Sequence, residues 1–135
     1  MTGKIILTAA GAVLLIGSAL PTLADTFTEE DEKRWGEEFT AVAREGRRLW
    51  TSPELGTNGL ACAQCHPNAA NTHPETYPKF QKQLGKVAPI WEMINWCIRN
   101  PLQGKALDPA DPKMTAIQAY IAQERRGVPL APGKH

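Results

Sequence analysis

The stretch Cys62-Ala63-Gln64-Cys65-His66 decides how the rest of the chain is interpreted. It matches C-x-x-C-H, the attachment motif of c-type haem. Two thiols three positions apart at the start of a helix can each add to one vinyl group of the same porphyrin, and the adjacent imidazole can then bind the iron. A zinc site would need two further Cys or His ligands at short spacing, but the third cysteine, Cys97, lies far downstream. The motif therefore predicts one covalently bound haem c, held by Cys62, Cys65 and His66.

The size and charge of the chain fit a small single domain. Its 135 residues include 15 Lys and Arg against 14 Asp and Glu, which gives a net charge of +1. This balance provides no electrostatic reason to expect nucleic acid or another strongly anionic partner. A chain of this length has a limited core of its own, so we expect the porphyrin to fill much of the interior.

The first 24 residues have the pattern of an export signal. Lys4 precedes the uncharged apolar run 5–20, Pro21 ends the run, and Thr22-Leu23-Ala24 offers small residues for cleavage. We therefore predict a cleaved signal peptide over residues 1–24 and a single cytochrome c domain over 25–135, with a loose tail from about residue 128. Because bacteria attach haem c outside the cytoplasmic membrane, the predicted location is the periplasm. Membrane association is expected only if the signal segment is retained.

The remaining sequence predicts an all-α, cytochrome c-like fold, with three to four helices around one haem. A capping-box pattern at Thr28 opens a helix over about 29–50, with Trp35, Phe39, Val42 and Ala43 on one face. Gly46 inside this helix indicates either a close crossing by another helix or an early helix end. We also expect a helix over 90–100, with Pro89 as its first residue, and a last helix from Asp111-Pro112 to about Gly127. The segment 77–85 is predicted to carry a short helical piece.

The residue opposite His66 on the iron would decide the chemistry. Cys97 shares an apolar stripe with Ile90, Met93, Ile94 and Ile98, where its thiolate could bind ferric iron. Met114 and Met93 are the other candidates, although a buried methionine most often only fills the core. His73 lies in a proline-rich loop, where a histidine is more often solvated or bonded to a haem propionate than bound to iron. Spacing alone leaves Cys97, Met114, Met93 and an open position unresolved.

Several short stretches after the motif together resemble a known family. They are Tyr77-Pro78-Lys79-Phe80, Leu84-Gly85-Lys86-Val87, Ile94-Asn95-Trp96-Cys97, Asn100 with Gly104-Lys105-Ala106-Leu107, Asp111-Pro112-Lys113-Met114 and Ala119-Tyr120-Ile121. Over residues 62–121 the chain is similar to one haem domain of the sulfur-oxidising cytochromes, which are the dihaem thiosulfate dehydrogenases and the Sox-type (SoxA-like) cytochrome subunit. The resemblance implies that Cys97 is the distal ligand, with Met114 as the alternative. Those proteins have two haem domains or a cytochrome partner, whereas this chain has one C-x-x-C-H motif.

Two functions follow from the motif and the resemblance. The first is a periplasmic c-type cytochrome that passes single electrons between redox partner proteins, another cytochrome being one candidate. The second is a haem subunit of an enzyme that oxidises thiosulfate or another sulfur compound. Of the two, the sequence favours the electron-transfer protein over the enzyme. A haem-based sensor is a third interpretation, but the sequence offers no signalling domain for it.

Overall fold

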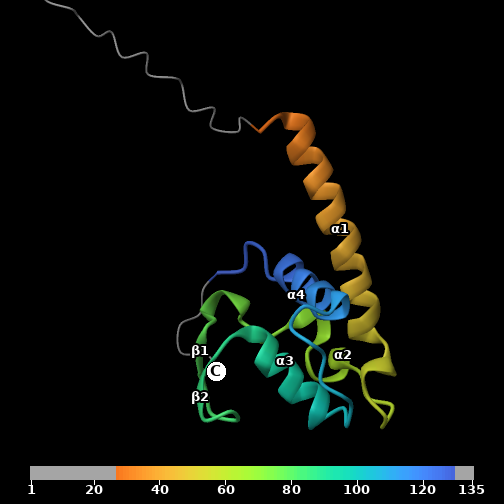
Figure 1. The fold of residues 1–135 in the computed structure, drawn as a ribbon, viewed down its shortest axis with the longest axis vertical. Helices are drawn as coiled ribbons and strands as arrows, with labels where there is room; N and C mark the ends of the chain where they lie inside the picture. The colour runs from red at the N-terminus through yellow and green to blue at the C-terminus, as the bar shows by residue number, and fades with distance from the viewer. Residues whose placement is uncertain (1–26, 130–135) are drawn as a thin grey trace, which may run out of the picture.

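The computed structural model describes residues 27–129, which form four α-helices and a small hairpin (Figure 1). The helices are α1 (Glu29–Thr51), α2 (Cys62–Cys65), α3 (Ile90–Arg99) and α4 (Pro112–Glu124), and the strands are β1 (Lys79–Gln81) and β2 (Lys86–Ala88). Three short 3-10 turns connect them: η1 (Pro53–Leu55), η2 (Pro67–Ala69) and η3 (Pro74–Thr76). The predicted cytochrome c-like, mostly helical fold is confirmed. The predicted signal peptide and most of the predicted tail lie outside the described residues.

Helix α1 begins where the capping box predicts. The Thr28 side chain accepts a hydrogen bond from the Asp31 backbone N–H at 3.1 Å, and the Asp31 carboxylate accepts one from the Thr28 N–H at 3.1 Å. These two bonds satisfy backbone donors that the first turn would otherwise leave free. Four acidic residues in the first turn also lie favourably at the positive end of the helix dipole. The predicted range of 29–50 is confirmed to within one residue.

Gly46 lies where α4 crosses α1. A Cβ atom at Gly46 would lie 1.9 Å from the Ala116 carbonyl oxygen and 2.7 Å from the Tyr120 Cβ. Only glycine allows the two backbones to approach this closely. The predicted close crossing is therefore confirmed, and the alternative, that Gly46 ends the helix early, is wrong.

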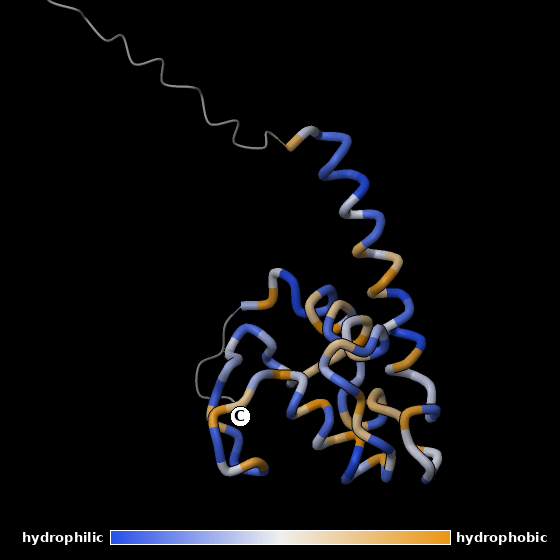
Figure 2. Tube along the Cα trace, viewed as in Figure 1, coloured by the Kyte–Doolittle hydropathy of each residue, from blue (hydrophilic) through white to orange (hydrophobic). Residues whose placement is uncertain are grey.

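Only the second half of α1 belongs to the core. Ala43, Leu49 and Trp50 are buried, but Trp35 and Val42 on the predicted apolar face are 41% and 39% exposed. Figure 1 shows the first half of the helix standing clear of the other helices, and Figure 2 shows that most of its residues are hydrophilic. The predicted face is real, but α4 covers only one end of it.

The segment predicted to be helical over 77–85 is instead the first part of the hairpin. Strands β1 and β2 are antiparallel, with Lys79 opposite Ala88, Phe80 opposite Val87 and Gln81 opposite Lys86. The chain reverses over a turn in which the Leu84 and Gly85 N–H groups donate to the Gln81 carbonyl, and Gly85 adopts a φ of +66°. The pairing of the two strands across this turn shows that the helical prediction for this segment is wrong.

Helices α3 and α4 complete the core. Pro89 was predicted to be the first residue of α3, but it is the residue before the helix. Pro112 opens α4, as predicted. The Asp111 side chain caps α4 by accepting a hydrogen bond from the Lys113 N–H at 2.8 Å. The largest fully buried side chains are Tyr120, Leu49, Ile98, Met114, Ile117 and Ile121. Within residues 27–129, no helix has both the length and the apolar character needed to cross a membrane.

Candidate haem site

Helix α2 is a single turn that carries both thiols of the C-x-x-C-H motif. The Gln64 side chain accepts a hydrogen bond from the Ala61 N–H at 2.7 Å and so fixes the start of the turn. Cys62 is half-buried against the core cluster, whereas Cys65 is exposed. Within residues 27–129, which include all three cysteines of the chain, every cysteine is free. Both thiols of the motif are thus available for bonds to a ligand.

His66 ends this turn, and its ring is held in one orientation. Its Nδ1 atom lies 2.8 Å from the Ala70 carbonyl oxygen, which can only accept a hydrogen bond, so Nδ1 carries the proton. Nε2 is then the nitrogen with a free lone pair. A second hydrogen bond of this kind is what orients metal-binding histidines in proteins. Together with the two free thiols, this donor set fits a c-type haem.

Cys97 lies on α3 near the motif cysteines. Burial raises the pKa of the Cys97 thiol, and the nearby Cys65 raises it further. Burial also raises the pKa of Cys62 to about 11, with a further contribution from Cys97. Cys62 packs against the core cluster to which Ile94 and Ile98 of α3 belong, so the helix that carries Cys97 shares this cluster with the haem motif. The fold brings Cys97 to the same region as the haem motif, although the two are more than 30 positions apart in the sequence.

The two methionine candidates occupy different settings. Met114 is fully buried on α4 and belongs to the core cluster that also contains Leu49 and Tyr120. Met93 is half-buried on α3, one helical turn before Cys97. Within residues 27–129, no group of three or more His, Cys, Asp or Glu side chains is arranged to hold a metal ion by itself.

His73 is not solvated, which leaves a bond to a haem propionate as the other position that the sequence favoured. Its side chain is buried, and its Nδ1 atom lies 3.2 Å from the Glu75 carboxylate. The residue has a φ of +47° directly before the turn η3, and the Thr76 hydroxyl donates to its carbonyl at 2.8 Å. This backbone conformation turns the ring toward the interior instead of toward solvent.

Trp50 is a supporting residue that the sequence reasoning missed. Its indole N–H donates to the His66 carbonyl at 2.8 Å, and its ring lies 5.7 Å from that of Tyr120. The last turn of α1 is thereby fixed to the motif on one side and to α4 on the other. The sequence signal was a tryptophan at the end of a helix, a few residues before the haem motif.

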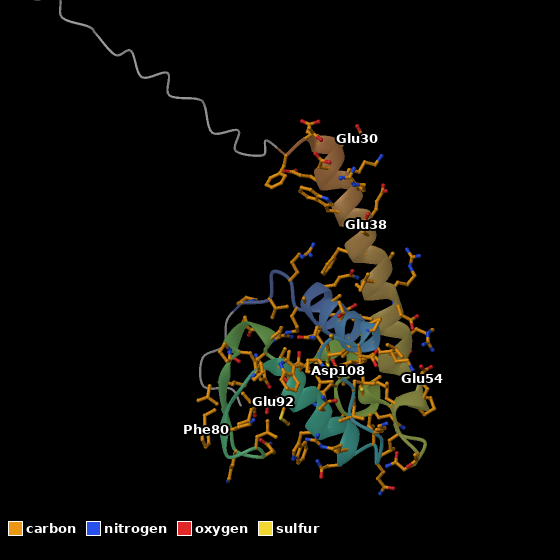
Figure 3. All side chains as sticks on the ribbon, viewed as in Figure 1. Glu30, Glu38, Glu54, Phe80, Glu92 and Asp108 are labelled. Carbon is orange, nitrogen blue, oxygen red and sulfur yellow. The ribbon has the colours of Figure 1, made fainter. Side chains whose placement is uncertain are left out.

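Tyr77 and Gln81 lie on the Cys97 side of the site. The Gln81 amide donates to the Tyr77 hydroxyl at 2.5 Å. Burial raises the pKa of Tyr77 to about 12, and the charge of a Cys97 thiolate contributes to this rise. In strand β1, Gln81 is buried, whereas Phe80 is 63% exposed and points outward (Figure 3).

The comparison with known protein families is decisive for the class of the domain. The family described as SoxA/TsdA, cytochrome c domain, matches residues 45–130. The chain belongs to this family. The resemblance found in the sequence is confirmed, and membership of a cytochrome c domain family implies haem c as the cofactor. The projecting first half of α1 precedes the matched range.

Relatives of this SoxA/TsdA domain are larger proteins. The chain is 38% identical over 90 residues to the L-cysteine S-thiosulfotransferase subunit SoxA of Rhodovulum sulfidophilum, a match covering 64% of this chain and 31% of the relative. It is 30% identical over 136 residues to the thiosulfate dehydrogenase of Psychrobacter arcticus, covering 91% and 40%. It is 29% identical over 90 residues to the thiosulfate dehydrogenase of Allochromatium vinosum, covering 58% and 33%. The chain thus spans less than half the length of these relatives.

Proposed function

We propose that this SoxA/TsdA-type domain is a periplasmic c-type cytochrome that carries single electrons. The observation that supports the proposal most directly is the one-turn helix α2, which presents two free thiols beside a histidine whose Nδ1 proton is already committed to Ala70. In this proposal Cys62 and Cys65 hold one haem covalently and His66 is its proximal ligand. The bound haem supplies a one-electron ferric/ferrous couple.

Cys97 is the distal ligand in this proposal. Its location near Cys62 and Cys65 supports this role, and Met114 is already packed in the core cluster. The buried thiol has a raised pKa, so without a metal it remains neutral at pH 7. Binding to iron therefore releases the Cys97 proton. A thiolate in this position favours the ferric state and lowers the reduction potential, whereas a thioether would raise it.

The proposed ligand pair is tested by optical and EPR spectra of the haem-loaded ferric protein. Wild type is compared with Cys97→Ala, Met114→Ala and the control Met93→Ala. A thiolate low-spin signal lost only in Cys97→Ala supports the His66/Cys97 pair. A methionine-to-iron charge-transfer band lost only in Met114→Ala contradicts it and makes the protein an ordinary His/Met electron carrier.

Covalent attachment and export have separate tests. The mass of the denatured protein, expressed with its first 24 residues in a bacterium that matures haem c, is expected to equal one haem plus a chain that begins at residue 25. Cys62→Ala with Cys65→Ala is expected to release the haem on denaturation. Haem that stays bound in the double variant, or mature protein found in the cytoplasm, would contradict this part of the proposal.

A second candidate function is suggested by the relatives, whose names describe a thiosulfotransferase subunit and thiosulfate dehydrogenases. In this alternative the chain is a haem subunit of an enzyme that oxidises thiosulfate or a related sulfur compound. Its test is thiosulfate-dependent reduction of the haem, in the presence and absence of a second cytochrome. Reduction that requires Cys97 favours the enzyme, whereas reversible redox without any turnover favours the electron carrier.

A further inference from the structure

The outer face of the hairpin carries an exposed apolar pair. Phe80 of β1 and Val87 of β2 lie directly opposite each other in the antiparallel register. Both side chains are largely exposed, at 63% and 64%, whereas the next residues along the two strands, Gln81 and Ala88, are buried. Figure 3 shows Phe80 at the outer edge of the molecule. The two strands thus present one contiguous apolar spot to solvent, because directly opposed side chains of an antiparallel pair touch.

Lysines flank this pair, and no acidic residue interrupts them. Over residues 76–91 the sequence has Lys79, Lys82 and Lys86 but no Asp or Glu. Within the described part of the chain, Lys86 forms an ion pair with Glu92 at 2.5 Å, whereas Lys79 and Lys82 form none. The chain as a whole has a net charge of only +1, so this excess of positive charge is local to the hairpin.

The hairpin is joined directly to the helix that carries the proposed distal ligand. Strand β2 ends at Ala88, and α3 begins at Ile90 after a single residue. Ile90 packs against the same core cluster as Cys62 of the haem motif. Ile90 and Cys97 are seven positions apart, which is a rise of about 10 Å along α3. A protein bound at the hairpin would therefore lie at the start of the helix that carries Cys97, and the path to the iron would be short.

The charge of this surface decides which kind of partner it fits. A second copy of the chain would place lysines against lysines, so the surface does not complement itself. A protein that presents an apolar patch with carboxylates around it would complement both the Phe80–Val87 pair and the lysines. A small contact with an apolar centre and a charged rim is typical of transient encounters between electron-transfer proteins.

We propose that the outer face of the hairpin is the docking surface for a redox partner protein whose own surface is acidic around an apolar patch. This inference rests on the proposed electron transfer and adds to it the class of partner and the place where it binds. In the encounter the iron passes from ferrous to ferric, and the metal of the partner gains the one electron. The lysines speed the arrival of the partner, and the apolar pair holds it in register.

The charged part of the surface is tested by the reaction of the reduced, haem-loaded protein with plastocyanin, a blue copper protein with an acidic surface. Stopped-flow absorbance gives the second-order rate constant for reduction of Cu(II) to Cu(I). The rate constant is expected to fall as the salt concentration rises, and Lys79→Glu with Lys82→Glu is expected to lower it about tenfold or more at low salt. The control Arg44→Glu with Arg47→Glu changes the net charge equally on α1 and is expected to have little effect. Equal losses in the two variants overturn the inference.

The apolar part of the surface is tested in the same reaction. Phe80→Ser with Val87→Ser is expected to lower the rate constant about fivefold or more, because the encounter loses its buried centre. Trp35→Ser with Val42→Ser is the matched control, since it removes another exposed aromatic and valine pair, at 41% and 39%, from α1. A wild-type rate in the hairpin variant overturns the role of the pair.

Two further measurements separate this inference from the function on which it rests. Voltammetry is expected to give a reversible one-electron couple at the same potential in wild type and in every variant, which shows that the haem site is intact. A wild-type protein without such a couple overturns the proposed electron transfer, whereas a normal couple with hairpin variants that react like wild type overturns the docking surface alone. Lysine-dependent binding to phosphatidylglycerol vesicles, with no effect of the lysines on the plastocyanin reaction, overturns the choice of a protein as the partner.

Discussion

Asn95 shows how a single side chain can replace a missing backbone partner. Its amide group donates to the Leu107 carbonyl and accepts from the Leu107 N–H, both at 2.8 Å. Asn95 is 4% exposed, so these groups have little access to water. The two bonds fix the connection between α3 and α4 against the helix that carries Cys97. A buried backbone segment without such partners would be costly.

Replacing Asn95 by Ala is expected to lower the free energy of unfolding by about 2 to 4 kcal/mol, because both polar groups of Leu107 then lack a partner. Denaturant unfolding of the haem-loaded protein measures this loss. Asn100→Ala serves as the control, since the Asn100 side chain donates one exposed hydrogen bond to the Trp96 carbonyl. The control is expected to lose less than about 1 kcal/mol. Equal losses in the two variants would contradict the role given to Asn95.

At this scale, the sequence was informative where a motif fixes local chemistry. It identified Cys62, Cys65 and His66 as a group because C-x-x-C-H places them on one turn. The apolar stripe left Cys97 as one of several candidate ligands, and only the family resemblance favoured it. It missed Trp50 and Asn95, whose partners are backbone atoms 16 and 12 positions away. A backbone carbonyl has no sequence signature, so only the fold could reveal these two roles. The burial of His73 was missed because its left-handed backbone conformation could not be foreseen.

Two glycines in α1 allow a controlled comparison at the scale of the element. Gly46→Ala is expected to destabilise the protein by about 2 to 3 kcal/mol, because the added methyl group would overlap the α4 backbone. Gly36→Ala is expected to stabilise it by about 1 kcal/mol, since alanine is the better helix former and its Cβ would meet nothing within 4 Å. Denaturant unfolding of the haem-loaded protein measures both changes. Two changes of the same sign would show that the crossing at Gly46 is looser than described.

The predicted helices succeeded where their ends carry local signals. Thr28 with Asp31, and Asp111 with Pro112, are capping patterns that depend on neighbouring residues alone. The hairpin was not predicted, because each strand has three residues, too few to display an alternating pattern. The exposure of Trp35 and Val42 could not be predicted either, because periodicity identifies an apolar face but not the length over which a neighbouring helix covers it.

On the scale of the whole molecule, a network of ion pairs around Arg48 and Glu54 connects α1, η1 and α4 at the surface. The Arg48 guanidinium contacts the carboxylates of Glu45 in α1 and Glu54 in η1, and Lys113 of α4 lies 3.8 Å from Glu54. The hydrogen bond from Arg48 is the main reason that the pKa values of Glu45 and Glu54 fall below the ordinary 4.5. Carboxylates with lowered pKa values contribute stability above their unfolded pKa, and this contribution is lost as the pH falls.

The melting temperature is therefore expected to fall as the pH drops below about 4.5, and to fall less steeply in Arg48→Gln. Thermal unfolding at a series of pH values, followed by circular dichroism, measures both slopes. Arg99→Gln is the control, because the described residues give Arg99 no ion pair. A variant whose acid slope matches that of wild type would show that other carboxylates dominate the acid response.

The length of α1 places the tip of this helix far from the proposed haem ligand His66. Trp50 lies against His66, whereas Trp35 lies 15 positions earlier, about 20 Å along the helix axis. Electron tunnelling weakens exponentially with distance, so a redox partner that docked only at Trp35 would lie too far from His66 for fast electron transfer.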